Sequence, residues 1–199
     1  MDWLTTSTIL ERLHDFRDQE MWQRFAQRFR RPLASFVRRF GLTQEEIDDV
    51  VQETLLAFAE AYRAGRYDRN AGRLSSWLFG IAYRQAANAQ RSRARRREHV
   101  VEAAHASFLD RVPDESEAQA AWDADWEQAA LDAALTQLRG EVAAHTFRVF
   151  ELVVRAGRSP DEAAAELGMT RDAVYVAKHR VLKRLGELVR EFEDPAPGG

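Results

Sequence analysis

The sequence of 199 residues contains no cysteine, which excludes a disulfide framework, a cysteine-based zinc site and a thiol nucleophile. No apolar run approaches the ~18 residues that a membrane-spanning helix requires. The opening MDWLTTSTILERL lacks the basic stretch and the apolar segment that mark a secretory signal. Hydrophobic residues make up 45% of the chain and charged residues 31%, which is typical of globular proteins. We therefore expect a cytoplasmic protein of one or two domains with no membrane insertion.

The sequence also lacks the patterns that identify a catalytic centre. It has no glycine-rich phosphate loop, no GxSxG and no HExxH. Glu141 and His145 are four residues apart on an expected helix, a spacing more typical of a surface pair than of a metal site. Acidic residues are numerous but spread out, so no pair of carboxylates can be assigned to acid–base chemistry. We therefore expect that the protein is not an enzyme and that it binds no metal and no cofactor.

The net charge of −3 conceals an uneven distribution. Residues 1–100 carry 18 arginines and 13 acids, whereas residues 101–199 carry 11 bases and 19 acids. Between Glu98 and Asp132 ten acids accompany a single base, Arg111. Because nucleic-acid binding depends on local patches, the overall acidity does not exclude a DNA-binding protein.

Apolar residues recur every three or four positions along most of the chain, which predicts helices and an all-α fold. The first apolar face runs from residue 22 to residue 40, and Pro32 within it predicts a kink or a break near Arg31. No segment alternates between apolar and polar residues over a useful length, so we expect no strands.

Two further helices follow in the N-terminal half. Thr43 and Glu46 form a capping box, which opens a helix that continues to Tyr62. Residues 65–72 form a loop rich in glycine and polar residues. The next helix begins near residue 74 and runs into the arginine-rich stretch that ends at residue 97.

Residues 98–128 are acidic and rich in alanine, contain Pro113 and lack a sustained apolar face. This composition predicts a flexible acidic linker with some transient helix. We therefore expect two helical domains, residues 1–97 and 129–194, joined by this linker and followed by a disordered tail over residues 195–199.

The C-terminal part of the chain shows the pattern of a helix-turn-helix. Ser159 opens a short helix over residues 160–167 with a second capping box. Gly168 supplies the positive φ of the turn, and Thr170 caps a second helix from residue 171 to about residue 189. This second helix exposes side chains suited to phosphates and base edges: Tyr175, Lys178, His179, Arg180, Lys183 and Arg184.

Two blocks of sequence resemble the extracytoplasmic-function, or group IV, sigma factors, which are two-domain bacterial initiation factors. The first block comprises DDVVQET at 48–54, YDRNAG at 67–72 and WLFGIA at 77–82, followed by the arginine run, and is similar to region 2. The second block is the helix-turn-helix, which is similar to region 4. Together the blocks cover residues from about 10 to 192 in the order found in the family.

The resemblance implies binding to promoter DNA and to core RNA polymerase, through the clamp of the largest subunit and the flap of the second. In the family an acidic helix of region 2 docks on the clamp. The matching positions share one side of the second helix: Glu46, Asp49, Gln52 and Glu53. An ordinary solvated helix face has a similar composition. The acidic linker is implied to thread toward the polymerase cleft, although a solvating spacer would look the same. An anti-sigma factor is a further partner that the resemblance allows.

The family reads the −10 element as a melted single strand. The matching positions offer aromatic faces and phosphate-binding groups: Tyr67, Arg73, Tyr83, Arg84, Asn88, Arg91 and Arg93. Trp77 falls in phase with Leu74 and Leu78, which favours a core position. Arg84 stands where the family often has asparagine at a base pocket. Because a guanidinium cannot accept a hydrogen bond, we expect either that the preferred −10 base differs from that of the family or that Asn88 contacts the base in place of Arg84.

The implied −35 contacts lie on the second helix of the helix-turn-helix: Arg171, Tyr175, Lys178, His179, Arg180, Lys183 and Arg184. Tyr175 and Val176 stand where the family commonly has arginine or lysine followed by serine, so its −35 sequence does not transfer. The alternative function is a helix-turn-helix regulator that binds duplex DNA as a dimer without docking on polymerase, and an interaction scaffold is a third. A regulator needs neither a melting loop nor an acidic docking helix, which favours the sigma factor.

Overall fold

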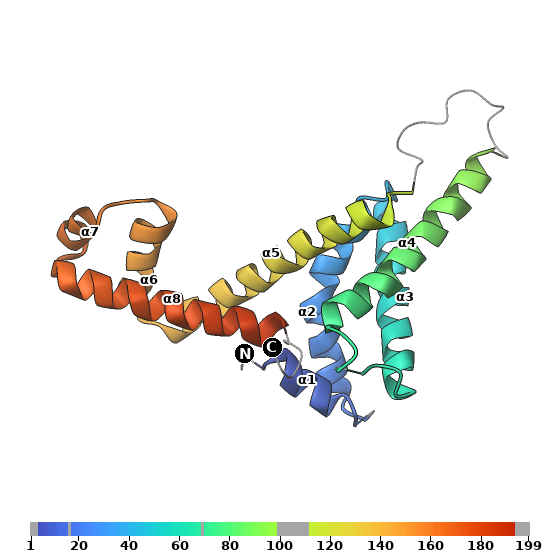
Figure 1. Cartoon of the computed structure of the whole chain (residues 1–199), viewed down its shortest axis with the longest axis horizontal. Coiled ribbons are helices and arrows are strands. Elements are labelled where there is room, and N and C mark those ends of the chain that lie inside the picture. The colour runs from blue at the N-terminus through green and yellow to red at the C-terminus, as the bar shows by residue number, and fades with distance from the viewer. Residues whose placement is uncertain (1–3, 16, 69, 99–111, 194–199) are drawn as a thin grey trace. The chain divides into compact units, whose positions relative to one another are not determined.

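A computed structural model describes residues 4–15, 17–68, 70–98 and 112–193 (Figure 1). All regular elements in these ranges are helices, so the predicted all-α fold is confirmed. Two compact units divide the described residues, one over 6–129 and the other over 130–193 together with residues 4 and 5. The helices are α1 (Thr6–Arg12), α2 (Gln19–Arg38), α3 (Gln44–Arg63), α4 (Leu74–Glu98), α5 (Glu115–Glu141), α6 (Ala144–Val149), the π-helical η2 (Phe150–Arg155), α7 (Pro160–Leu167) and α8 (Arg171–Glu193).

The first unit is built on α2, α3 and α4, which contact one another side by side (Figure 1). The aromatic face of α2 lies in the core, where Phe25 stacks on Phe58 of α3 with ring centroids 4.4 Å apart. Helix α2 runs unbroken through Pro32, so of the predicted kink or break near Arg31 the break is wrong. A proline inside a helix costs one backbone hydrogen bond, but Pro32 itself is buried and the apolar face of α2 continues on both sides of it.

Helix α5 begins inside the segment that was expected to be a flexible linker. Residues 99–111 of that linker, like the tail over 195–199, lie outside the described residues. From Glu115 onward the chain is helical, and Ala118, Trp122 and Trp126 are buried. Their spacing of four residues places them along one side of the helix. This apolar stripe is narrow and surrounded by acids, which is why composition alone suggested a linker.

The aromatic residues of α5 dock on α2 and α4 within the first unit. Trp126 stacks on Phe29 of α2, with ring centroids 5.1 Å apart and planes 6° apart. Trp122 meets Phe36 of α2 at 5.4 Å and Phe79 of α4 at 6.2 Å. The first half of α5 therefore belongs to the core of the N-terminal unit.

The second unit contains the predicted pair of helices α7 and α8. The Ser159 hydroxyl accepts from the backbone N–H of Glu162 at 3.2 Å, and Gly168 has a φ of 63°. Thr170 accepts from the N–H of Ala173 at 3.2 Å and so caps α8. Helix α8 continues to Glu193, beyond the predicted end, because its buried side continues through its last turn. The core of this unit contains residues from α5 to α8: Ala134, Leu138, Phe147, Phe150, Val174, Ala177, Val181, Leu185 and Leu188.

Candidate functional site

The outer side of α3 presents a polar face, which we call the acidic face, formed by Asp49, Gln52 and Glu53. All three residues are exposed and are spaced so that they share one side of the helix. The same side carries Leu56, which is 56% exposed. Leu56 was not among the residues expected from the sequence, although its position three residues after Glu53 places it on this side of the helix. A face that combines carboxylates with an exposed leucine offers a partner both charge and apolar contact.

Glu46, the fourth residue expected on this face, is engaged within its own domain. Its carboxylate accepts from the backbone N–H of Thr43 at 2.9 Å and pairs with Arg93 at 3.2 Å and Arg96 at 3.3 Å. Burial by itself would raise the pKa of Glu46. The hydrogen bonds from Thr43 and the charges of the two arginines outweigh burial, so the pKa lies below its ordinary value. Glu46 therefore ties the start of α3 to α4.

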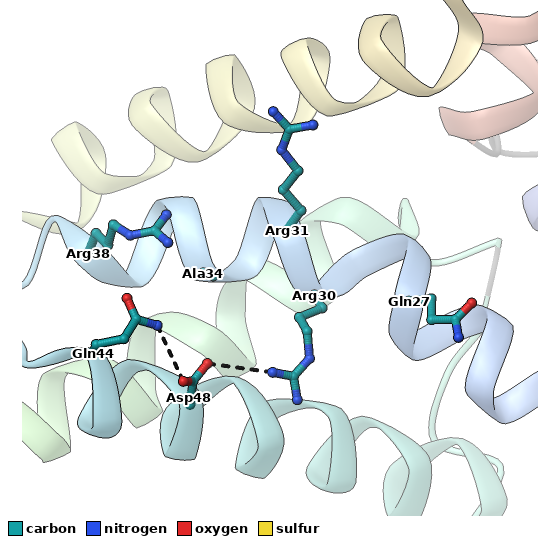
Figure 2. Close-up of a pocket in the computed structure, with 7 residues that line it drawn as sticks. All are labelled: Gln27, Arg30, Arg31, Ala34, Arg38, Gln44 and Asp48. Carbon is teal, nitrogen blue, oxygen red and sulfur yellow. Dashed lines mark hydrogen bonds and ion pairs between the residues drawn. The ribbon is translucent and has the colours of Figure 1, made fainter. Parts of the chain in front are cut away.

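A hollow between α2 and α3 lies beside the start of the acidic face (Figure 2). Asp48, which precedes Asp49, accepts from Arg30 at 3.5 Å and from Gln44 at 3.3 Å. Figure 2 shows Arg31 pointing away from Asp48. The residues that line the hollow are Gln27, Arg30, Arg31, Ala34, Arg38, Gln44 and Asp48. A partner that covered the hollow together with the acidic face would therefore meet charges of both signs.

One side of α4 carries Trp77, Gly80, Arg84, Asn88 and Arg91 at intervals of three and four residues, and we call this set the α4 stripe. Arg84, Asn88 and Arg91 are exposed. The guanidinium of Arg84 folds back over Gly80, since a Cβ placed on Gly80 would lie 3.5 Å from Nη1 of Arg84. Arg91 donates to the side-chain oxygen of Asn88 at 3.2 Å. The stripe therefore unites three of the residues expected to bind the −10 strand.

Tyr67 extends the α4 stripe at its N-terminal end. Its ring stacks on Trp77, with centroids 4.9 Å apart and planes 23° apart. Both residues are half-buried, so Trp77 is not the enclosed core residue that its spacing favoured. Trp77 contacts the core through Phe58, at 5.4 Å. Arg73 is exposed in the loop that leads into α4. The loop contributes Tyr67 and α4 contributes Trp77 to one aromatic pair, and Arg73 lies between them in the sequence.

Side chains along a helix turn by about 100° per residue, so Tyr83 and Arg93 point to other sides of α4 than the α4 stripe. The Tyr83 hydroxyl donates to the carbonyl of Pro113 at 3.0 Å, and its ring lies 5.9 Å from Phe40. Arg93 is paired with Glu46 and also donates to a backbone carbonyl of the same domain. The structure therefore does not bring these two residues together with Arg84.

The outward side of α8 carries most of the residues expected at the −35 element. Arg171, Tyr175, His179, Arg180 and Lys183 are exposed, and Lys178 is half-buried. The guanidinium of Arg171 lies 5.7 Å from the centre of the Tyr175 ring. These residues give the first turns of α8 a surface that is both basic and aromatic.

Arg184, the seventh residue expected at the −35 element, is engaged within its own domain. Its guanidinium donates to both carboxylate oxygens of Glu141 at 2.7 and 3.0 Å, and it also pairs with Glu191 at 3.1 Å and Glu187 at 3.4 Å. The bond to Glu141 is the main cause that raises the pKa of Arg184, and the same bond lowers the pKa of Glu141. Arg184 thus joins α8 to the end of α5.

Two further properties of the described ranges concern metal ions and membranes. No group of three histidine or carboxylate side chains gathers there as a metal site. None of the helices in that part of the chain has the length and hydropathy of a membrane span.

Comparison with known proteins gives three findings. Residues 25–96, which include the acidic face and the whole α4 stripe, match the family model of Sigma-70 region 2. The ECF RNA polymerase sigma factors SigD of Mycobacterium bovis (strain ATCC BAA-935 / AF2122/97) and Mycobacterium tuberculosis (strain ATCC 25618 / H37Rv) are each 35% identical over 163 residues, covering 79% of this chain and 68% of the relative. The structure of CnrH in complex with the cytosolic domain of CnrY aligns with a TM-score of 0.36 and 22% identity, over 91% of this chain and 94% of that one.

Proposed function

Because this chain belongs to the extracytoplasmic-function family of RNA polymerase sigma factors, we propose that it binds core polymerase and starts transcription at specific promoters. In this proposal the first unit docks on polymerase and holds the melted −10 strand, while α8 reads the −35 duplex. One observation carries the proposal: a single domain, matched by the region 2 model, has an acidic face on α3 and an aromatic and basic stripe on α4.

Docking is assigned to the acidic face, with the clamp of the largest polymerase subunit as its partner. Asp49 and Glu53 supply charge and Leu56 supplies an apolar contact, which suits a basic partner surface with an exposed apolar residue. Glu46 is left out of this assignment because it is paired with Arg93 and caps α3. Docking on the flap of the second subunit and binding of an anti-sigma factor stay predictions from the resemblance.

A double charge reversal tests the docking assignment. Asp49→Lys with Glu53→Lys should weaken assembly with core polymerase about tenfold at moderate salt, because two attractions become repulsions. The matched control is Asp123→Lys with Glu127→Lys, which makes the same charge change at the same spacing on exposed positions of α5. Affinity is measured by titrating labelled protein with core polymerase, and circular dichroism checks helicity. Equal affinities of the two double variants would overturn the docking assignment.

The −10 strand is assigned to the Tyr67–Trp77 pair and the exposed part of the α4 stripe. Opening DNA costs on the order of 1.4 kcal/mol per base-pair step, so an initiation factor must favour the unpaired strand. Stacking of a base on an aromatic side chain contributes about 1–3 kcal/mol, and arginines add attraction to the backbone. The half-buried aromatic pair leaves ring surface for such stacking, and Arg84 and Arg91 follow it along the helix.

The −35 duplex is assigned to the exposed side chains of α8, without Arg184. His179→Ala and Arg180→Ala should weaken binding to the cognate −35 duplex more than binding to scrambled DNA. Lys183→Ala, as a phosphate contact, should weaken both duplexes about equally and reduce the salt slope by about one unit. Fluorescence anisotropy at several salt concentrations measures all three variants. If all three variants lose the same affinity for both duplexes, α8 does not read bases through these residues.

A further inference from the structure

The arginine-rich end of α4 has two sides that differ in their bonding. On the first side, Arg95 follows Arg91 by four residues and so continues the side of the helix that carries the α4 stripe. Both arginines are exposed and donate to neutral side chains. Arg91 donates to Asn88 at 3.2 Å, and Arg95 donates to Ser92 at 3.3 Å. Because these acceptors are uncharged, the positive charge of this side stays available to a phosphate.

On the second side, Arg93 and Arg96 converge on the carboxylate of Glu46 at the start of α3. Oε2 of Glu46 lies 3.2 Å from Arg93, and Oε1 lies 3.3 Å from Arg96. The Arg93 side chain is 20% exposed and also donates to the carbonyl of Gly41. The Arg96 side chain is 67% exposed. Arg96 is therefore the arginine that a ligand can most easily take from Glu46.

The carboxylate of Glu46 holds these two arginines as a backbone phosphate would. Each of its two oxygens faces one guanidinium. A phosphodiester likewise has two charged oxygens that accept from arginine. The carboxylate is held in place because it also accepts from the backbone N–H of Thr43 at 2.9 Å. A DNA phosphate that approached this side of α4 would therefore compete with Glu46 for the same donors.

We propose that Glu46 limits non-specific DNA binding by the chain free of polymerase, because its carboxylate occupies Arg93 and Arg96 in place of a DNA phosphate. The inference rests on the proposed function in one respect, which is that DNA lies along α4. It adds a residue that weakens DNA binding instead of supplying it. A chain restrained in this way is bound less by the excess of non-promoter DNA and stays available to polymerase.

Binding of the full chain to a duplex of scrambled sequence, without polymerase, tests the inference. Glu46→Gln removes the charge and keeps the capping box, because glutamine also serves at this position. It should tighten binding about fivefold and steepen the salt dependence by about one unit, since one more phosphate contact forms. The matched control Glu45→Gln makes the same change at the exposed neighbouring position. It should tighten binding less than about twofold, because the charge of an exposed side chain is screened by salt.

Arginine variants locate the effect on the second side of α4. Arg96→Gln in the otherwise unaltered chain should change the affinity little, because Glu46 already holds this side chain. Arg95→Gln, the same change on the first side, should weaken binding about threefold. In a chain that also carries Glu46→Gln, Arg96→Gln should remove most of the gain. Fluorescence anisotropy at several salt concentrations measures all the variants, and circular dichroism checks their helicity.

Two results would overturn the inference. The first is equal tightening by Glu46→Gln and Glu45→Gln, which would reflect net charge alone. The second is a loss of affinity by Arg96→Gln in the unaltered chain as large as that by Arg95→Gln, a comparison that needs no change at Glu46.

The inference and the proposed function can fail separately. A chain that directs transcription normally, but whose DNA binding does not respond to Glu46→Gln, overturns the inference and leaves the proposed function standing. A chain that does not assemble with core polymerase, but binds DNA more tightly through Arg96 when Glu46 is replaced, supports the inference and overturns the proposed function.

Discussion

Truncation of Trp122 tests whether the first half of α5 is part of the N-terminal domain. The side chain of Trp122 is 0% exposed and contacts the rings of Phe36 and Phe79. Replacing a buried tryptophan or phenylalanine with alanine typically costs 3–5 kcal/mol, because apolar contacts are lost and a cavity remains. The Trp122 indole N–H is buried without a hydrogen-bond partner in the described structure, a penalty of about 1–3 kcal/mol that alanine relieves. The difference between these two contributions is centred on about 2 kcal/mol, which is the decrease in the free energy of unfolding that we expect for Trp122→Ala.

The size of the effect is measured by urea unfolding of the full chain, and its location by hydrogen exchange. Protection of amides in α2 and α4 should fall in Trp122→Ala, while protection in α7 and α8 should not change. Trp122→Phe keeps an aromatic ring and removes the unpaired N–H, so it should cost no more than about 1 kcal/mol. The control Glu127→Ala alters an exposed residue of the same helix and should stay within about 0.5 kcal/mol of the wild type.

The reasoning is refuted if Trp122→Ala costs less than about 0.5 kcal/mol and leaves the protection of α2 and α4 unchanged. That result would mean that residues 115–129 do not contribute to the N-terminal core. It would restore the interpretation of this segment as a linker.

Further predictions concern ion pairs and the turn between α7 and α8. Arg184→Ala should destabilise the second unit by about 1 kcal/mol, because a partly exposed network of ion pairs is lost. The control Lys183→Ala should have no effect on stability. Weaker −35 binding by Arg184→Ala at an unchanged melting temperature would contradict this prediction. The folded pKa of Glu46 is depressed, so its contribution to stability is present at neutral pH and is lost as the pH falls through the folded pKa, below 4.5. Glu46→Gln should therefore reduce the loss of stability between pH 7 and pH 3, and identical acid titrations of variant and wild type would oppose the assignment. Gly168→Ala should cost about 1 kcal/mol in thermal unfolding, because alanine is strained at a φ of 63°, and an unchanged melting temperature would show that the turn relaxes.

Local signals made most of the helices predictable. The capping boxes at Thr43 and Ser159, and the turn at Gly168, depend on residues within four positions of one another. The apolar face of α2 was also visible, because its period of three to four residues is strong. Pro32 does not end α2, since tertiary burial on both sides of it outweighed one missing hydrogen bond.

The features that sequence analysis missed depend on distant partners. Glu46 pairs with Arg93, 47 residues away, and Glu141 with Arg184, 43 residues away, and neither pairing has a sequence signal. Trp126 is buried against Phe29, which lies nearly a hundred residues earlier in the chain. For this reason some candidate site residues are exposed on the acidic face, the α4 stripe or α8, whereas others are engaged in ion pairs and hydrogen bonds inside a domain.

Promoter-dependent transcription tests the central claim most directly. Core RNA polymerase is incubated with the full chain and a linear template that carries the region upstream of its own gene, and run-off products are measured. A sigma factor should yield a transcript of defined length that core polymerase alone does not make, and the Asp49→Lys, Glu53→Lys variant should reduce it while the Asp123→Lys, Glu127→Lys control should not. Binding of the protein to the duplex template with no transcript from core polymerase would contradict the account and favour a helix-turn-helix regulator.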